Sequence, residues 1–221
     1  MIRALIFDFD GLILETEEPI FVAWQEIYER HDCHLAYETW SSIIGTADYE
    51  FEPIAELERQ LGQEVDRERL SRSQRQRELE LILQQQPMPG VEDYLKDARQ
   101  SGMKIGLASS STCEWVTDHL ERLGLLEYFD AIYGSDDVER TKPDPALYLS
   151  VLEDFALQPE EAIVFEDSPN GVLAAKRAGI FCVAVPNAMT HGLPLDHADM
   201  RLESLADLSL GELLQQLDGE M

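Results

Sequence analysis

Basic residues are scarce in this sequence of 221 residues. Lysine and arginine together number 17, against 44 aspartate and glutamate residues, so the formal net charge is −27 at pH 7. A field of this sign repels nucleic-acid phosphates and anionic lipid head groups. The composition therefore argues against nucleic acid or a membrane surface as a partner. Any anion site must be built locally from backbone amides, a lysine and a bound cation.

Cysteine is also rare, and long apolar runs are missing. Cys33, Cys113 and Cys182 are widely spaced and form no C-x-x-C pair. This usage fits a reducing compartment better than a disulfide framework, and it argues against a thiolate metal site. The first apolar run, residues 2–7, is interrupted by an arginine and is too short for a signal peptide or a membrane span. We expect a cytoplasmic protein.

The sequence does contain a regular alternation of buried strands and helices. Five short apolar runs predict strands, and a helix-like segment precedes each of them except the first. The predicted strands are residues 2–7, 103–108, 131–133, 162–165 and 181–185, and the predicted helices are residues 91–100, 112–123, 145–155 and 169–178. Alternation of this kind predicts an α/β fold with a parallel, doubly wound sheet.

Residues 16–87 interrupt this alternation, and we refer to them as the helical insert. They show helix-like periodicity without an intervening strand and include a highly charged stretch, residues 64–80. The proline-rich segment 84–90 cannot continue a helix and is a candidate hinge. We therefore predict a core domain of residues 1–15 and 88–221 with a helical domain inserted after the first strand.

Polar residues follow the predicted strands. In an open parallel sheet, ligands bind beyond the carboxyl ends of the strands, so these positions are the candidate site. The residues are Asp8 and Asp10 after the first strand, Ser109 and Ser110 after the second, Lys142 beyond the third, and Glu166 and Asp167 after the fourth. Each one alone has an ordinary explanation as a turn former, a helix N-cap or a surface lysine. Their common placement favours a single site.

Asp8 and Asp10 suit phosphoryl transfer through an aspartate. A carboxylate can attack phosphorus and split a slow hydrolysis into the formation and breakdown of an aspartyl phosphate, and we assign this role to Asp8. Asp10 lies on the same side of an extended chain and can act as general acid and base. The carboxylates and a phosphate repel one another, so a hard cation is required. We expect Mg²⁺, bound by Asp8, Asp10, Asp167 and Glu166.

The remaining candidates can bind phosphate. Ser109 can donate a hydrogen bond to a phosphoryl oxygen, and we group Ser110 with it. Lys142 offers a positive charge to both Asp8 and the phosphate. Gly11 allows the backbone to approach the phosphate, where its amide can donate without interference from a Cβ atom.

These motifs resemble the haloacid dehalogenase superfamily, in particular its phosphatases related to β-phosphoglucomutase. The resemblance covers nearly the whole chain and rests on Asp8-Phe9-Asp10-Gly11-Leu12, Leu107-Ala108-Ser109, Lys142-Pro143 and Phe165-Glu166-Asp167-Ser168. It implies a Rossmann-like core and a helical cap, here the helical insert, that closes over the substrate and recognises the leaving group. It also implies hinges near Glu15 and Thr16 and near residues 87–89, and a metal contact from the backbone carbonyl of Asp10.

The sequence departs from the family at several positions in the helical insert. Glu15 stands where the family usually has aspartate, which affects the hinge geometry. Ile20 and Asp48 occupy the neighbourhoods of a histidine and an arginine that β-phosphoglucomutases share, which weakens the mutase interpretation. Residues 41–46 resemble the substrate-facing loop of the cap, with Gly45 as its flexible point. The stripe of Phe21, Trp24 and Tyr28 is expected to form the core of the insert.

The leading hypothesis is a Mg²⁺-dependent phosphatase that acts on a small phosphorylated metabolite, for example a sugar phosphate, as a monomer or weak dimer. A phosphomutase with the same nucleophile is the nearest alternative. A true haloacid dehalogenase is disfavoured because attack on carbon needs neither Asp10 nor a metal. A signalling receiver is disfavoured because it needs no insert, and a non-catalytic phosphate-responsive binding protein is the remaining alternative.

Overall fold

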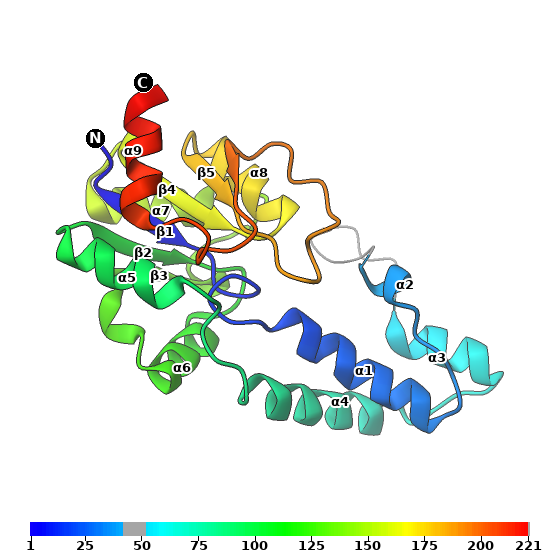
Figure 1. Cartoon of the computed structure of the whole chain (residues 1–221). Helices are drawn as coiled ribbons and strands as arrows, with labels where there is room; N and C mark the ends of the chain where they lie inside the picture. Colours follow the sequence, from blue (N-terminus) through cyan, green and yellow to red (C-terminus); the bar gives the residue numbers. More distant parts are fainter. Residues whose placement is uncertain (42–51, 221) are drawn as a thin grey trace.

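The protein has the predicted α/β architecture (Figure 1). The structure is a computed structural model that describes residues 1–41 and 52–220. Its strands form one parallel sheet in the order β3-β2-β1-β4-β5-β6. They are β1 (Ala4–Phe7), β2 (Lys104–Ala108), β3 (Ala131–Tyr133), β4 (Ala162–Glu166), β5 (Phe181–Ala184) and β6 (Met200–Arg201). The first strand lies in the middle and the chain leaves it to both sides, as in doubly wound sheets.

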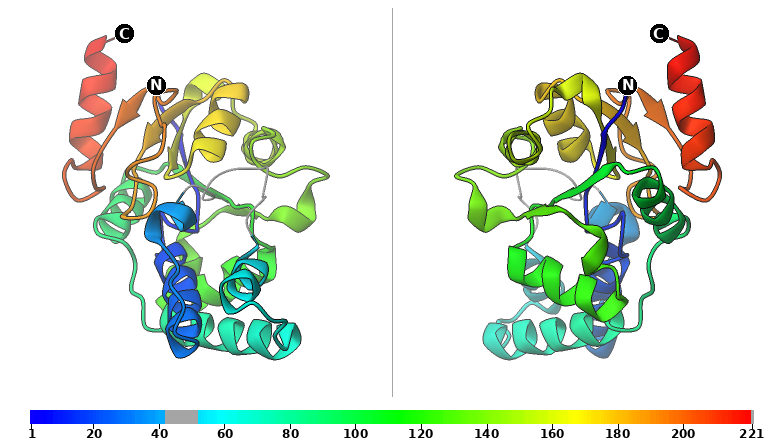
Figure 2. Two further views of the ribbon diagram at one scale, coloured as in Figure 1. Left: turned by 90° about the vertical axis from the view of Figure 1, so that its right-hand side faces the viewer. Right: turned by 90° about the vertical axis from the view of Figure 1, so that its left-hand side faces the viewer.

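Helices cover both faces of this sheet (Figures 1 and 2). Successive side chains of β1 point to opposite faces. Leu5 and Phe7 belong to the core that includes residues of α5 (Val91–Gln100), α6 (Cys113–Leu123) and α9 (Leu210–Glu220), whereas Ala4 and Ile6 belong to the core beneath α7 (Ala146–Phe155) and α8 (Pro169–Arg177). Both faces of β1 are therefore buried, which explains its unbroken apolar sequence.

The five predicted strands and four predicted helices are all present, with ends shifted by a few residues. Helix α9 and the two-residue strand β6 were not predicted, and β6 has no apolar run to mark it. Three short 3₁₀ helices were also not predicted, namely η1 (Leu126–Tyr128), η2 (Ser135–Asp137) and η3 (Pro159–Glu161). No helix in the described residues is both long enough and apolar enough to cross a membrane.

The helical insert lies to one side of the sheet (Figures 1 and 2). It contains α1 (Glu17–Arg30), α2 (Tyr37–Ser41), α3 (Pro53–Leu61) and α4 (Arg67–Ile82). Phe21, Trp24 and Tyr28 are buried in a separate hydrophobic cluster with residues of α2 and α3, which confirms the predicted core stripe. The domain boundaries at residues 15/16 and 87/88 stay a prediction.

The two linkers of the insert lie side by side. Leu14 and Pro87 form an isolated antiparallel bridge, and the Met88 amide donates to the Ile13 carbonyl at 2.8 Å. The Arg122 guanidinium, from α6, donates to carbonyl oxygens at the end of α4 and in the second linker, including that of Gln85 at 3.1 Å. These contacts fix the linkers to the core where the hinges are predicted.

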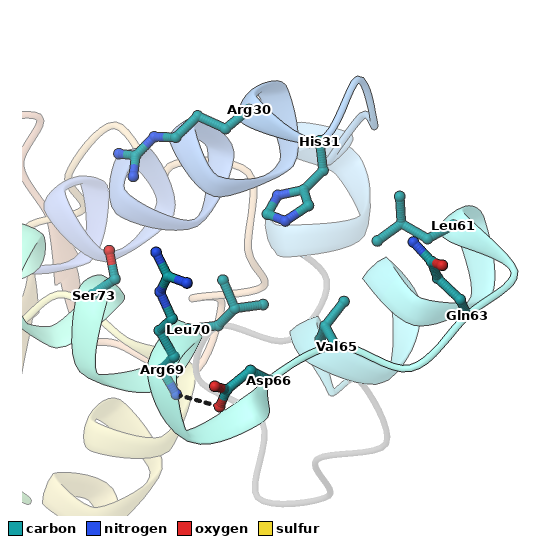
Figure 3. A pocket seen from close by; sticks show the side chains of 9 residues that line it. All are labelled: Arg30, His31, Leu61, Gln63, Val65, Asp66, Arg69, Leu70 and Ser73. Carbon is teal, nitrogen blue, oxygen red and sulfur yellow. Dashed lines mark hydrogen bonds between the residues drawn. The ribbon is translucent and has the colours of Figure 1, made fainter.

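A cavity of about 420 Å³ lies within the insert (Figure 3). It is lined by residues from the end of α1, the loop after α3 and the first half of α4, namely Arg30, His31, Leu61, Gln63, Val65, Asp66, Arg69, Leu70 and Ser73. None of these residues comes from the carboxyl ends of the strands. The cavity is therefore separate from the candidate site.

Candidate active site

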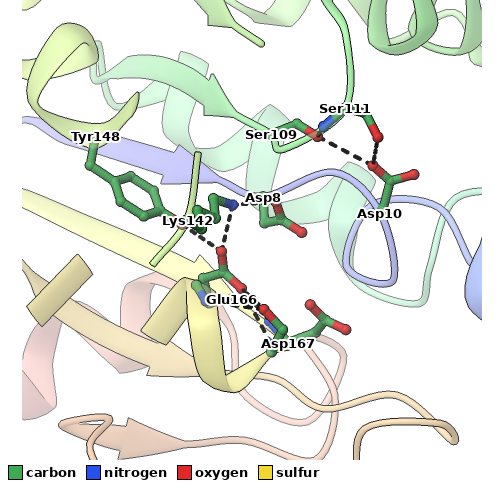
Figure 4. A network of polar contacts seen from close by, with 10 residues as sticks. Asp8, Asp10, Ser109, Ser111, Lys142, Tyr148, Glu166 and Asp167 are labelled. Atoms are coloured by element: carbon green, nitrogen blue, oxygen red, sulfur yellow. Dashed lines mark hydrogen bonds and ion pairs between the residues drawn. The ribbon is translucent and has the colours of Figure 1, made fainter. Parts of the chain in front are cut away.

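Parallel pairing brings the predicted site residues to one edge of the sheet (Figure 4). The last residue of β1, Phe7, is in register with Leu107 of β2 on one side and with Phe165 of β4 on the other. The residues that follow these three are therefore neighbours. Asp8 therefore lies between Ala108 and Glu166, and Ser109 follows Ala108 at the same edge of the sheet.

Lys142 connects two of the carboxylates. Its Nζ atom forms an ion pair with Asp8 Oδ1 and another with Glu166 Oε1 at 2.6 Å. The lysine side chain is buried, and its Nζ also lies 5.1 Å from the centroid of the Tyr148 ring. Burial alone would lower the pKa of Lys142, but the adjacent Asp8 and Glu166 carboxylates raise it. The lysine is therefore a permanent positive charge beside Asp8.

Glu166 is completely buried, and both of its oxygens have donors. The Tyr148 hydroxyl donates to Oε1 at 2.6 Å, beside Lys142. Oε2 accepts from the Asp167 amide at 3.1 Å and from the amide and hydroxyl of Ser168 at 3.3 and 3.2 Å. A Cβ atom on Gly171 would come within 1.8 Å of Oε1, so this glycine lets α8 lie against the carboxylate. Glu166 is thus anchored from both sides.

The acidic groups perturb one another strongly. Burial raises the pKa of Asp8 to about 8. The positive charge of Lys142 opposes this shift, and the negative charges of Glu166 and Asp10 add to it. Burial and the charges of Asp8 and Glu166 raise the pKa of Asp167 well above its ordinary value. In this cluster, one ammonium group faces three buried carboxyl groups. A further positive charge would stabilise the ionised form of all three.

A divalent cation fits this cluster. Asp8, Glu166 and Asp167 each offer a carboxylate oxygen, and these atoms lie within 4.8 Å of one another. Carboxylate oxygens are hard ligands of the kind that Mg²⁺ and Ca²⁺ bind. Because donors already occupy both oxygens of Glu166, Asp8 and Asp167 are better placed to bind the cation directly.

Asn187, which was not among the predicted site residues, fixes Asp167 from beyond the end of the fifth strand. Its Nδ2 donates to Asp167 Oδ2 at 2.9 Å and to the Gly11 carbonyl at 3.0 Å. Its Oδ1 accepts from the amides of Met189 and Thr190. The residue lies three positions after β5. Its position after the carboxyl end of a predicted strand, like that of the other site residues, is the sequence signal for it.

Gly11 has a different environment from the predicted one. Its φ is +80°, and a Cβ atom there would come within 2.5 Å of both Asn187 Nδ2 and Asp167 Oδ2. Only glycine therefore fits this turn. The Gly11 amide donates to the Leu14 carbonyl at 2.7 Å. The predicted use of this amide for phosphate is not favoured by the structure, because the N–H closes the turn instead.

Asp10 is held by residues that follow β2. Its Oδ2 accepts from Ser111 Oγ at 2.7 Å and from Ser109 Oγ at 3.2 Å, and its Oδ1 accepts from Trp115 Nε1 at 3.2 Å. The Ser110 side chain is exposed and does not take part in this network. Ser111 and Trp115 were not among the predicted residues, although both lie within six positions of Ser109 in the sequence.

The start of α1 explains Glu15. Its Oε1 accepts from the amides of Glu17 and Glu18 at 2.9 and 3.1 Å, so the glutamate caps the helix from the position before the Thr16 N-cap. Ile20, another departure, is partly buried against the hydrophobic cluster of the insert. Asp48, and residues 42–46 of the loop that resembles the substrate-facing loop, with Gly45, lie outside the described residues.

Glu17 contributes a further acidic group from α1. Burial, together with the charges of Asp10, Glu15 and Glu78, raises its pKa to about 7. The folded state disfavours the ionised carboxylate of Glu17. The free energy of unfolding of wild type therefore falls as the pH rises from the ordinary pKa of glutamate toward about 7. We expect Glu17→Gln to raise the melting temperature above about pH 7.5 and to have little effect near pH 4.

Thermal unfolding at several pH values in EDTA checks this prediction. Glu18→Gln is the matched control, because Glu18 is adjacent and exposed. Equal pH dependence of the melting temperature in Glu17→Gln and Glu18→Gln would contradict the prediction.

Comparisons with known proteins agree with this geometry. The sequence profile of the haloacid dehalogenase-like hydrolases matches residues 5–185. YhcW of Bacillus subtilis (strain 168), whose name describes it as a phosphatase without naming a substrate, is 46% identical over 220 residues, 100% of each chain. The phosphorylated carbohydrates phosphatase of Thermotoga maritima is 35% identical over 80% of this chain and 82% of that protein.

Two further similarities concern a mutase and a phosphate complex. The β-phosphoglucomutase of Bacillus subtilis is 31% identical over 97% of this chain and 94% of its own. The crystal structure of CbbY from Rhodobacter sphaeroides in complex with phosphate has a TM-score of 0.75 at 30% identity, covering 96% of this chain and 99% of that one. The chain therefore belongs to the haloacid dehalogenase-like hydrolases and is an enzyme that acts on phosphate esters.

Proposed function

We propose that the protein hydrolyses phosphate monoesters of small hydroxylated metabolites, with Asp8 as nucleophile and Mg²⁺ as cofactor. The observation that carries the proposal is the buried cluster in which Lys142 contacts Asp8 while Asp167 lies beside them. It combines a nucleophilic carboxylate, a fixed positive charge and a site for a divalent cation. Phosphoryl transfer needs these three components in one place.

The reaction takes place in two halves. The Asp8 carboxylate attacks phosphorus, and the bond from phosphorus to the ester oxygen breaks with its electron pair on that oxygen, which takes a proton from Asp10. Water then attacks the phosphoryl-Asp8, giving its proton to Asp10, while the bond from phosphorus to Asp8 breaks. The products are the alcohol and inorganic phosphate, and both aspartates return to their starting states.

Lys142 and Ser109 act on the phosphoryl group. The ammonium of Lys142 offsets negative charge on the oxygens while Glu166 and the Tyr148 hydroxyl keep it in place. Ser109 now donates to Asp10 and can turn to a phosphoryl oxygen, because a serine hydroxyl rotates freely.

Asp8 and Asp167 would hold the Mg²⁺ ion, with the Asp10 backbone carbonyl as the family resemblance implies. When bound, the ion supplies positive charge that lowers the cost of bringing a dianionic phosphate to an anionic nucleophile. Glu166, also predicted as a ligand, acts instead through Lys142, because its oxygens already accept five hydrogen bonds.

The leaving group faces an acceptor-rich surface of the insert. Glu17 on α1 and Glu78 on α4 both have raised pKa values, caused first by burial and in part by the charge of Asp10, so both lie near it. Gln74 is buried and donates to Glu78 at 2.8 Å. Carboxyl oxygens favour ligands with hydroxyl donors over apolar ones. A polyol or sugar leaving group fits this surface.

Phosphate release tests the proposal. Wild type is assayed on sugar phosphates, glycerol phosphate, nucleotides, phosphoglycolate and p-nitrophenyl phosphate, with Mg²⁺ or EDTA. We expect EDTA to lower turnover at least about 100-fold and added Mg²⁺ to restore it. We also expect Mg²⁺ to raise the melting temperature more at about pH 8 than at about pH 5, because the ion competes with protons on Asp8 and Asp167.

No phosphate release from any substrate would contradict the hydrolase proposal. Conversion of one sugar phosphate into its isomer without free phosphate would instead indicate a phosphomutase. Turnover that persists unchanged in EDTA would contradict the role of the metal.

A further inference from the structure

Three donors of two chemical kinds converge on the carboxyl group of Asp10. Ser109 and Ser111 donate through hydroxyl groups to Oδ2, and Trp115 donates through its indole N–H to Oδ1 (Figure 4 shows the two serines). All three residues follow β2, on the loop to α6 and in its first turn. One side of the carboxyl group therefore faces serines and the other faces an indole.

These donors respond differently when Asp10 carries a proton. A hydroxyl group can rotate and either donate or accept, whereas an indole N–H can only donate. If an oxygen of Asp10 carried a proton directed at the indole, that proton and the indole hydrogen would repel each other. A carbonyl oxygen is a stronger acceptor than a protonated one, and a serine hydroxyl can turn to accept a hydrogen bond. With the Trp115 contact at 3.2 Å intact, the Asp10 proton is therefore favoured on Oδ2, and Oδ1 is the carbonyl oxygen.

Trp115 is itself fixed against the segment that carries both aspartates. Its ring meets that of His119 edge to face, with centroids 4.3 Å apart, and the His119 ring stacks on that of Phe9 at 6.3 Å. Phe9 is the residue between Asp8 and Asp10. Burial, with Arg122 nearby, lowers the pKa of His119 and so disfavours a charged imidazole beside the indole. The indole therefore has a defined place relative to Asp10.

We infer that Trp115 is a positioning residue for the acid step. Its N–H fixes the rotation of the Asp10 carboxyl group, so that Oδ2 delivers the proton to the leaving oxygen. The inference rests on the proposed function, because it needs Asp10 to be the general acid. It predicts a defect that depends on how much the leaving group needs a proton: large for an alcohol, small for p-nitrophenolate.

The test compares kcat/KM for p-nitrophenyl phosphate, phenyl phosphate and glycerol phosphate in wild type and Trp115→Phe. We expect a loss of about 10-fold or more with glycerol phosphate and less than about 2-fold with p-nitrophenyl phosphate. Trp24→Phe, a buried tryptophan in the insert, is the matched control and should lack this dependence on the leaving group. Asp10→Asn gives the upper limit of the effect.

Two outcomes would overturn the inference. Equal losses on all three esters would assign Trp115 a structural role alone, and unchanged values on all of them would assign it none. If Trp115→Phe fails to fold, β-(3-benzothienyl)alanine at position 115 removes the N–H and keeps the ring shape. Full activity of Asp8→Asn would instead contradict the proposed function, so the two failures are distinguishable.

Discussion

Asp8→Asn is expected to abolish phosphate release and to stabilise the metal-free protein at alkaline pH. An amide oxygen is a poor nucleophile, so kcat should fall at least about 10⁴-fold, as it does when other enzymes lose a nucleophile. The stability gain has a separate cause. Burial, despite Lys142, raises the pKa of Asp8 from 3.8 to about 8, so the folded protein disfavours the carboxylate.

The sign of the pH dependence follows from this raised pKa. Between pH 3.8 and about pH 8, the folded protein retains a proton on Asp8 that the unfolded chain has lost. Wild-type stability therefore falls as pH rises through this interval, whereas asparagine does not titrate. In EDTA, the melting temperature of Asp8→Asn should exceed that of wild type at about pH 8.5, and the difference should shrink toward about pH 4.

Asp154→Asn, an exposed aspartate near the end of α7, is the matched control and should show no such trend. Mg²⁺ should reverse the order of wild type and Asp8→Asn, because only wild type retains the Asp8 ligand. A variant that releases phosphate, or that melts below wild type in EDTA at alkaline pH, would contradict this account.

The placement of the site residues at the carboxyl ends of the strands was predictable, because it follows from the sheet topology alone. Asp8, Ser109, Glu166 and Asp167 come directly from or after adjacent parallel strands, so their proximity needs no knowledge of the helices. Lys142 reaches the same place along a longer connection after β3. The family resemblance, which depends on the same residues, could therefore be identified without a structure.

The residues that hold these groups were less predictable. Tyr148 lies on α7, and its approach to Glu166 depends on how that helix packs on the sheet. Trp115 reaches Asp10 from the first turn of α6. A buried or half-buried aromatic on a helix usually belongs to the core, so neither hydrogen bond leaves a signal in the sequence. The hydrogen bonds that anchor Glu166 show the same limit, because one of their donors, Tyr148, comes from α7.

Gly171→Ala is expected to have the largest effect on stability among the glycine substitutions in helices. A Cβ atom at this position would lie 1.8 Å from Glu166 Oε1 and 1.9 Å from its Cδ. Glu166 cannot move away without losing its hydrogen bonds to Lys142 and Tyr148, which would leave buried charge unpaired. We expect a loss of about 3 kcal/mol in the free energy of unfolding, at the upper end of overpacking effects.

Gly211→Ala is the matched control for this substitution. Gly211 is also helical, but a Cβ atom there meets nothing within 4 Å. Its replacement by alanine should stabilise the protein by about 0.5–1 kcal/mol through helix propensity alone. Urea unfolding measures both changes, and phosphate release reports whether Lys142 keeps its place beside Asp8. If Gly171→Ala kept the stability and turnover of wild type, Glu166 would be free to move. The conclusion that Glu166 anchors Lys142 would then be wrong.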